Sequence, residues 1–229
     1  MQEVARYPVR FEPTYPEGLS RLLNLPFFIG TVIKLILCIP FLIFLAIFLP
    51  GGLGGGGGGG QGTEILAVIS GVFALLWLIG PVWILFTGQY PRGLWDFLVG
   101  VQRVQARVHG YAGSLNDKYP PFALKQVDDD QVSFEVDYPG GFNRLLNFPL
   151  FGQIAKLILC IPHLIVVFFL SIAAIVLVFV GQFVILFTGN MPSGMWNFIA
   201  GTLQWQYRVF AYVLAFTDRY PPFSLTIGS

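Results

Sequence analysis

The sequence predicts an all-α membrane protein of two tandem repeats, and three observations support that class. Residues 157–187 contain no Asp, Glu, Lys or Arg, and a straight helix of that length would reach roughly 46 Å, against a hydrocarbon core of roughly 30 Å. Only 11% of the 229 residues are charged, 55% are hydrophobic and the mean hydropathy is +0.70, whereas soluble domains carry about 25% charge. The motifs of the first half also return in the second.

The repeat is defined by motifs that recur at fixed offsets. Residues 15–26 return at 138–149, an offset of 123, and residues 86–122 return at 187–223, an offset of 101. The first copy therefore holds about 22 additional residues, which include the glycine tract 51–60. Such self-similarity indicates one structural unit written twice.

A small antiparallel β-sheet is expected on the cytoplasmic face, where it would tie the repeats together. Four segments alternate apolar and polar residues as strands do. They contain Val9 and Phe11, Val132 and Phe134, Phe122 and Leu124, and Phe223 and Leu225. The acidic run Asp128–Asp130 predicts a turn between two of them.

Repeat 1, placed at residues 1–127, contains two apolar helices at residues 26–49 and 65–86. Between them lies the glycine-rich loop 50–63. This loop cannot lie in hydrocarbon, because each unpaired backbone group costs several kcal/mol there. It must emerge at a membrane surface, so we expect a transmembrane helical hairpin.

Repeat 2, placed at residues 128–229, aligns its Ser171–Ala174 segment with that loop. We therefore predict a second transmembrane hairpin with helices at residues 149–170 and 174–187. The second of these has only about 14 residues, and neither Gly nor Pro marks the turn. One long tilted helix remains open as the alternative.

Each hairpin is followed by an amphipathic helix, at residues 93–115 and 194–216. Apolar residues recur at helical spacing along one side of the first of these helices, while Asp96, Arg103 and Arg107 lie around the other side. Such a helix lies in the membrane interface, or packs across the hairpin ends, more readily than it spans a bilayer.

The positive charges predict the orientation. All 13 Lys and Arg residues fall outside the predicted hairpin turns, on the side that holds both termini. Under the positive-inside rule this multi-pass protein has both termini in the cytoplasm. Lys34 and Lys156 lie a turn or two inside apolar helices, and we expect their side chains to snorkel back to that face.

Two motifs carry a resemblance to a known family. They are Phe-Thr-Gly-x-x-Pro-x-Gly-x-Trp, at residues 86–95 and 187–196, and Asp-x-Tyr-Pro-Pro-Phe, at residues 117–122 and 218–223. With these motifs the chain resembles a bacterial membrane-protein family recorded only as a domain of unknown function. The resemblance implies the bacterial inner membrane as the location, and it implies no reaction, cofactor or substrate. Gln89 departs from the Arg that is common in the family at that place.

Six arginines are expected at the level of the cytoplasmic lipid headgroups. The amphipathic helices begin there with free N–H groups, so a phosphate of an anionic lipid could be held by charge and backbone together. The six are Arg21, Arg92, Arg103, Arg107, Arg144 and Arg208. The alternative interpretation is general anchoring and orientation by positive charge.

No catalytic, cofactor or metal site is predicted. His109 and His163 have no Cys, Asp or Glu neighbour at metal-ligand spacing, and we expect His163 to bond a backbone carbonyl freed by a helix kink. Cys38 and Cys160 lie in apolar runs and are expected to pack as inert small side chains. The net charge of +1 gives no indication of a nucleic-acid partner.

These observations favour a non-enzymatic integral membrane protein that serves as an accessory or scaffold subunit of a larger membrane complex and binds lipid. The alternative is a small transporter or channel with its path between the two parallel repeats, although charged residues are scarce in the apolar segments. A lipid-modifying enzyme would need Asp96, Asp117 or Asp218 to act with His109. An Asp before Tyr-Pro-Pro-Phe is better interpreted as a turn residue that bonds its own backbone.

Overall fold

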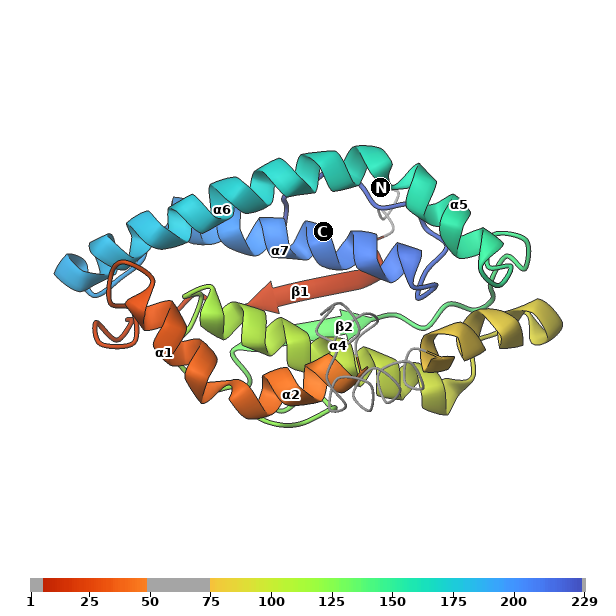
Figure 1. Cartoon of the computed structure of the whole chain (residues 1–229), viewed down its shortest axis with the longest axis horizontal. Helices are drawn as coiled ribbons and strands as arrows, with labels where there is room; N and C mark the ends of the chain where they lie inside the picture. The colour runs from red at the N-terminus through yellow and green to blue at the C-terminus, as the bar shows by residue number, and fades with distance from the viewer. Residues whose placement is uncertain (1–5, 49–74, 228–229) are drawn as a thin grey trace, which may run out of the picture.

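The structure is a computed structural model that describes residues 6–48 and 75–227. It is mostly helical, with one small antiparallel sheet (Figure 1). The strands are β1 (Val9–Pro13) and β2 (Val132–Val136), and the helices are α1 (Ile29–Leu37), α2 (Ile39–Phe48), the helix Leu75–Thr87, α4 (Arg92–Ala112), α5 (Phe151–Leu159), α6 (Ile161–Thr188) and α7 (Ser193–Val213). The predicted glycine-rich loop and the beginning of the helix predicted at residues 65–86 lie outside the described residues.

The two strands reveal how the repeats are related. β1 and β2 pair antiparallel, and Phe11 lies directly opposite Phe134. These two residues are equivalent under the repeat offset of 123, so each copy contributes the same residue to the central pair. Directly opposed residues of an antiparallel pair are related by a local two-fold axis perpendicular to the sheet. The repeats are therefore related by a pseudo-two-fold axis that passes between Phe11 and Phe134.

Contacts between the repeats obey the same symmetry. The loop before α1 donates from Leu19 N–H to the carbonyl of Gly189, 2.8 Å away, at the turn that follows α6. Reciprocally, the loop before α5 donates from Phe142 N–H to the carbonyl of Gly88 at 2.9 Å. Such reciprocal contacts are what a two-fold interface produces. Each repeat thus docks on the turn of the other, at opposite ends of the molecule (Figure 1).

The strands and helices form layers. The inner face of the sheet packs on α4 and α7, and the buried Tyr207 of α7 contacts the rings of both Phe11 and Phe134. α6 packs on the side of α7 away from the strand, and α2 packs on α4. The outer face of the sheet carries Arg10, which pairs with Glu135 and Asp137 at 2.9 and 2.8 Å.

The predicted strands at residues 122–124 and 223–227 are not strands in the structure. In repeat 1 the carbonyl groups of this segment are taken by an arginine. Arg107 donates to the carbonyls of Ala123 and Lys125, and it also pairs with Asp130. The segment is therefore held by a side chain instead of a neighbouring strand, and the described sheet has two strands.

The first helix of each repeat breaks at a cysteine. α1 ends at Leu37 and α2 begins at Ile39, with a bend of 67° between the two axes. In repeat 2 the same break separates α5 from α6 at Cys160. A proline follows each cysteine by two positions, Pro40 and Pro162. Proline has no N–H and its ring clashes with the carbonyl four residues earlier, which explains the break.

The hairpin predicted for repeat 2 is wrong. α6 extends without a break from Ile161 to Thr188, through the expected turn at Ser171–Ala174. The segment contains no Gly or Pro near that turn, and the Ser171 hydroxyl is satisfied by the carbonyl of Val167 at 2.6 Å. The open alternative of one long helix describes this segment better, and the break lies earlier in the chain, at Cys160.

Few helices are both long and apolar enough to cross a membrane. In the described parts of the chain α6 meets this test alone, and the bent pair α1–α2 meets it if counted as one span. The helix Leu75–Thr87 is apolar but shorter. The predicted amphipathic helices correspond to α4 and α7. Each of these begins one residue before its predicted start and ends three residues before its predicted end.

Candidate functional site

Each repeat buries a lysine in a cluster of polar groups. The Lys34 side chain is fully buried, and its Nζ lies 2.7 Å from Asp117 Oδ1. It also donates to Asn24 Oδ1 at 2.9 Å, and the amide of Asn24 donates in turn to both oxygens of Asp117 at 2.9 Å. The ring of Tyr111 covers the ammonium group at 5.0 Å. The cluster joins α1, the loop before it and the segment after α4.

Repeat 2 reproduces this cluster. Lys156 Nζ lies 3.0 Å from Asp218 Oδ1 and 2.7 Å from Asn147 Oδ1, beneath the ring of Tyr212 at 5.0 Å. The expectation that Lys34 and Lys156 snorkel to the membrane surface is therefore wrong, because each lysine is fully buried in the protein and pairs with a partly buried carboxylate. Charges are buried in proteins when they are paired and hydrogen-bonded.

The turn interpretation predicted that the two motif aspartates bond their own backbone. In the structure they bond another segment instead. Asp117 accepts from the backbone N–H of Ser20, and Asp218 accepts from that of Asn143 at 2.6 Å. Both acceptors thus reach the loop before the broken helix. Sequence reasoning missed the cluster because its members lie far apart in the chain. The signal that could have revealed it was the return of the same Asn, Lys and Asp in both copies.

The tyrosine of the same motif hydrogen-bonds a backbone carbonyl at the helix break. Tyr119 donates from its hydroxyl to the carbonyl of Leu37 at 2.9 Å, and Tyr220 donates to that of Leu159 at 2.9 Å. These carbonyls lie at the breaks, where no helical N–H reaches them. His163 was expected to fill this role. Instead it accepts from the indole N–H of Trp205 at 3.0 Å and stacks on Phe223.

The six arginines of the predicted headgroup site do not form one cluster. Arg107 and Arg208 are buried, and Arg208 donates to the carbonyl of Thr226 at 3.2 Å. Arg21 and Arg144 are exposed on the loops before α1 and α5, which lie at opposite ends of the molecule. Arg107 lies at Asp130 and Arg208 lies at Tyr7, so these four arginines belong to four separate places.

The remaining two arginines share a surface depression in repeat 1. Arg92 and Arg103 line a cavity of about 510 Å³ together with Lys125 and Asp96. The Arg92 guanidinium lies over the ring of Tyr138 at 3.8 Å, and Arg103 donates to the carbonyl of Phe134 at 2.9 Å. Three cations against one carboxylate make this depression the best anion site among the predicted arginines.

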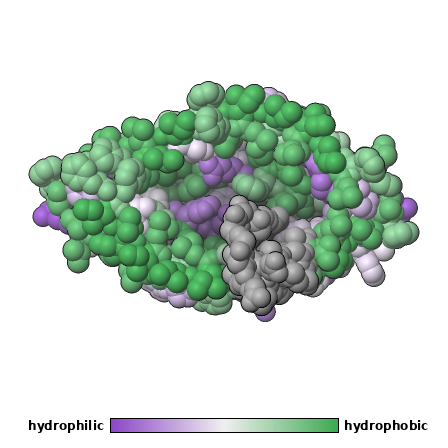
Figure 2. Space-filling view, viewed as in Figure 1, coloured by the Kyte–Doolittle hydropathy of each residue, from purple (hydrophilic) through white to green (hydrophobic). Residues whose placement is uncertain are grey.

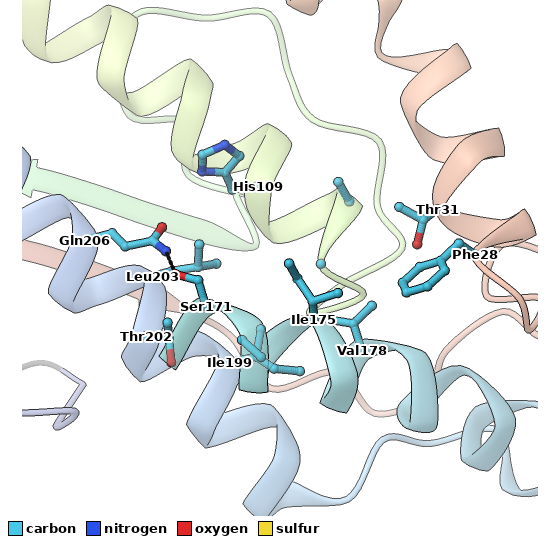
Figure 3. A pocket seen from close by; sticks show the side chains of 13 residues that line it. Phe28, Thr31, His109, Ser171, Ile175, Val178, Ile199, Thr202, Leu203 and Gln206 are labelled. Carbon is cyan, nitrogen blue, oxygen red and sulfur yellow. Dashed lines mark hydrogen bonds between the residues drawn. The ribbon is translucent and has the colours of Figure 1, made fainter. Parts of the chain in front are cut away.

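A second cavity, of about 320 Å³, lies between the two repeats (Figure 3). Repeat 1 contributes α1 and α4, and repeat 2 contributes α6 and α7. Its walls are mostly apolar, with Ile175 and Val178 of α6 pointing into it. Ser171 and Gln206 provide a polar edge, because the Gln206 amide donates to the Ser171 hydroxyl at 2.8 Å. Ligand sites are typically apolar hollows with a few such polar groups.

His109 is the titratable group of this cavity. Its Nδ1 lies 2.9 Å from the hydroxyl of Tyr207 on the other repeat. Burial lowers the pKa of His109 to about 4, so the imidazole is neutral at pH 7. A neutral imidazole beside a phenol can donate or accept one hydrogen bond, which suits an uncharged polar group better than an anion.

The groups of the enzyme hypothesis are not assembled. His109 bonds Tyr207, whereas Asp117 and Asp218 are paired with the buried lysines. Asp96 is exposed in the depression beside Arg92. Within residues 6–48 and 75–227, no three His, Cys, Asp or Glu side chains gather as a metal site would require.

Comparison with known proteins identifies two family segments. A family model described as "Domain of unknown function (DUF4389)" matches residues 64–123 and 153–224. The two matches fall in the two copies of the repeat. No curated protein and no solved structure matches the chain.

Proposed function

We propose, from the premise that the chain belongs to the DUF4389 family, that it is a non-enzymatic integral membrane protein and an accessory or scaffold subunit of a membrane complex. It resides in the bacterial inner membrane with both termini on the cytoplasmic side. The observation that carries this proposal is the apolar surface of the broken helices. Exposed aliphatic and aromatic side chains follow α1, α2, α5 and α6, among them Ile36, Ile158, Phe168, Phe169 and Val176. Contiguous apolar surface of this kind marks a membrane or protein interaction site.

Lipid binding is the second part of the proposal. Within the depression of repeat 1, Arg92, Arg103 and Lys125 bind the phosphate of an anionic lipid. The first two are among the six arginines expected there, whereas Arg107 and Arg208 serve internal contacts. Repeat 2 has Ser193 and Gln204 at the equivalent places, so the site exists once.

Binding to vesicles tests the lipid site. Replacement of Arg92 and Lys125 by Gln should abolish the preference of the purified protein for vesicles with phosphatidylglycerol over vesicles with phosphatidylcholine alone. Arg21→Gln, at an exposed arginine at the other end of the molecule, should leave that preference unchanged. An equal preference in all three proteins would contradict the site.

The subunit role is tested by copurification in mild detergent. We expect the same partner protein in independent preparations. A chain that is extracted alone, as a monomer, would contradict the scaffold role.

A transporter or channel is the second candidate, and the cavity between the repeats favours it. Its polar edge lies beside the middle of α6, where a path between the repeats would pass. Ile175→Trp should fill the cavity and reduce flux of small uncharged solutes in liposomes. Equal flux through empty liposomes and liposomes with protein would remove this candidate.

A further inference from the structure

The molecule has a charged surface at one end of the pseudo-two-fold axis, and apolar side chains surround the other end. The outer face of the sheet, through which the axis passes, carries Arg10, Glu12, Glu135 and Asp137. On the opposite side of α4 and α7 lie α6 and α2, whose outward side chains are apolar. Figure 2 shows apolar side chains along α6 and the α1–α2 pair, around a central hollow with polar residues inside.

The long helix lies across this axis. β1 extends along α7, as three contacts show. The ring of Tyr7 lies beside the Arg208 guanidinium, the N–H of Phe11 donates to the side-chain oxygen of Gln204, and the ring of Tyr15 contacts that of Trp196. α6 is antiparallel to α7, from the His163–Trp205 contact to Gly181, which lies beside Met191 just before α7 begins. The strand, α7 and α6 are thus aligned with the long dimension of the molecule, and the axis perpendicular to the sheet is perpendicular to α6 (Figure 1).

We infer that the protein lies flat in one leaflet of the bilayer, with its pseudo-two-fold axis along the membrane normal and α6 in the membrane plane. This inference rests on the proposed membrane location and specifies its geometry. The charged face of the sheet is in water, and the broken helices lie among the acyl chains. If α6 crossed the bilayer along its own axis, the charges of the sheet would lie near the hydrocarbon midplane, where ionised groups are rare and costly.

The dimensions agree with this placement. A helix with its side chains is about 10–12 Å thick, whereas one leaflet of hydrocarbon is roughly 15 Å deep, half of the 30 Å core. One layer of helices therefore fits in a single leaflet. The proline breaks are consistent with this placement, because they change the direction of the apolar helices within the layer. Helices with apolar faces are known to lie in the plane of a membrane in this way.

The two-fold axis also explains the one-sided charge pattern. An axis along the normal keeps equivalent residues of the two repeats on the same side of the membrane, as in parallel repeats. Arg21 and Arg144 are equivalent, exposed and at opposite ends of the molecule. They lie on one side of the membrane if the chain is flat, and on opposite sides if α6 crosses.

Tagging of both positions in one molecule distinguishes these arrangements. The full chain with Arg21→Cys and Arg144→Cys is reconstituted in sealed vesicles of phosphatidylethanolamine and phosphatidylglycerol. A membrane-impermeant maleimide polymer is added outside and quenched, and the tags on each molecule are counted by gel shift. Cys38 and Cys160 are fully buried, so the parent chain provides the baseline. A same-end pair, Arg21→Cys with Asn190→Cys, is the matched control.

Molecules that lie flat carry two tags or none, whatever the proportion inserted in each leaflet. Exactly one tag on most molecules, with two or none on the same-end pair, would overturn the flat arrangement. Permeabilised vesicles should give two tags on every molecule of both variants. A chain released from the vesicles by an alkaline wash would instead contradict the proposed membrane location itself, so the two failures are distinguishable.

Discussion

At the scale of single residues, the buried lysines show what the sequence leaves undetermined. Lys34 in an apolar helix indicated a snorkelling side chain, because nothing near it in the sequence is acidic. The partner that holds it, Asp117, lies 83 residues further along the chain, and only the fold brings the two together. The motif Asp-x-Tyr-Pro-Pro-Phe was recognisable as a repeated unit. Its contacts with the broken helix could not be recognised from the sequence.

The lysine cluster should contribute strongly to stability. Lys34→Ala leaves Asp117 partly buried without its cation, and we expect the free energy of unfolding to fall by about 3–5 kcal/mol, as for other broken buried pairs. Lys118→Ala removes an exposed lysine next to the same aspartate and should cost at most about 1 kcal/mol. Denaturant titration in detergent micelles measures both. Equal effects would show that Lys34 is not paired as described.

His109 should make stability depend on pH. Its folded pKa is about 4, below the ordinary value of about 6.5, so the unfolded chain binds a proton in a range where the folded chain does not. The free energy of unfolding should therefore fall as the pH decreases from 6.5 towards 4, by at most about 1.4 kcal/mol per pH unit.

The matched variant is His109→Gln, which retains a hydrogen-bonding group for Tyr207. Unfolding measured at pH 7, 6 and 5 should show a shallower pH dependence for this variant than for the parent. Identical slopes would mean that His109 does not remain neutral in the folded protein.

At the scale of elements, the amphipathic helices and the strands at the starts of the repeats followed from periodicity. The predicted strand residues Val9, Phe11, Val132 and Phe134 all lie in the observed sheet. The hairpin turn of repeat 2 did not follow, because it was inferred from an insertion in the other copy. An insertion shows where one copy tolerates extra residues, and it does not require the shorter copy to turn there. Pro162 was the local signal for a break, and the break lies beside it.

Two equivalent glycines test how tightly the helices pack on the turns that follow them. A Cβ at Gly80 would lie 2.0 Å from the ring of the buried Tyr90, whereas a Cβ at Gly181 would lie 2.8 Å from the flexible end of Met191. Gly80→Ala should therefore destabilise by about 1–3 kcal/mol through overpacking. Gly181→Ala should cost clearly less, because the methionine tip can move. Thermal unfolding of both variants measures the difference, and the reverse order would contradict the packing at Tyr90.

At the scale of the whole molecule, the two copies form one body with a charged face and an apolar face. The duplication and its family could be predicted from recurring motifs. The axis that relates the copies could not, since it depends on the antiparallel pairing of Phe11 with Phe134 and on the docking of each repeat against the turn of the other. With that axis along the membrane normal, as we infer, the helices form a layer parallel to the membrane surface instead of a set of crossings.

The depth of α6 in the bilayer tests this account most directly. Nitroxide labels on cysteines introduced at Ile165, Ile172 and Phe187, which are all exposed, report depth through collisions with oxygen and with a polar nickel complex. We predict that the three labels lie at depths within about 10 Å of one another, one helix diameter. A crossing helix would place the label at position 172 deep and the outer two near opposite surfaces, separated by roughly 33 Å. That profile would contradict the flat arrangement.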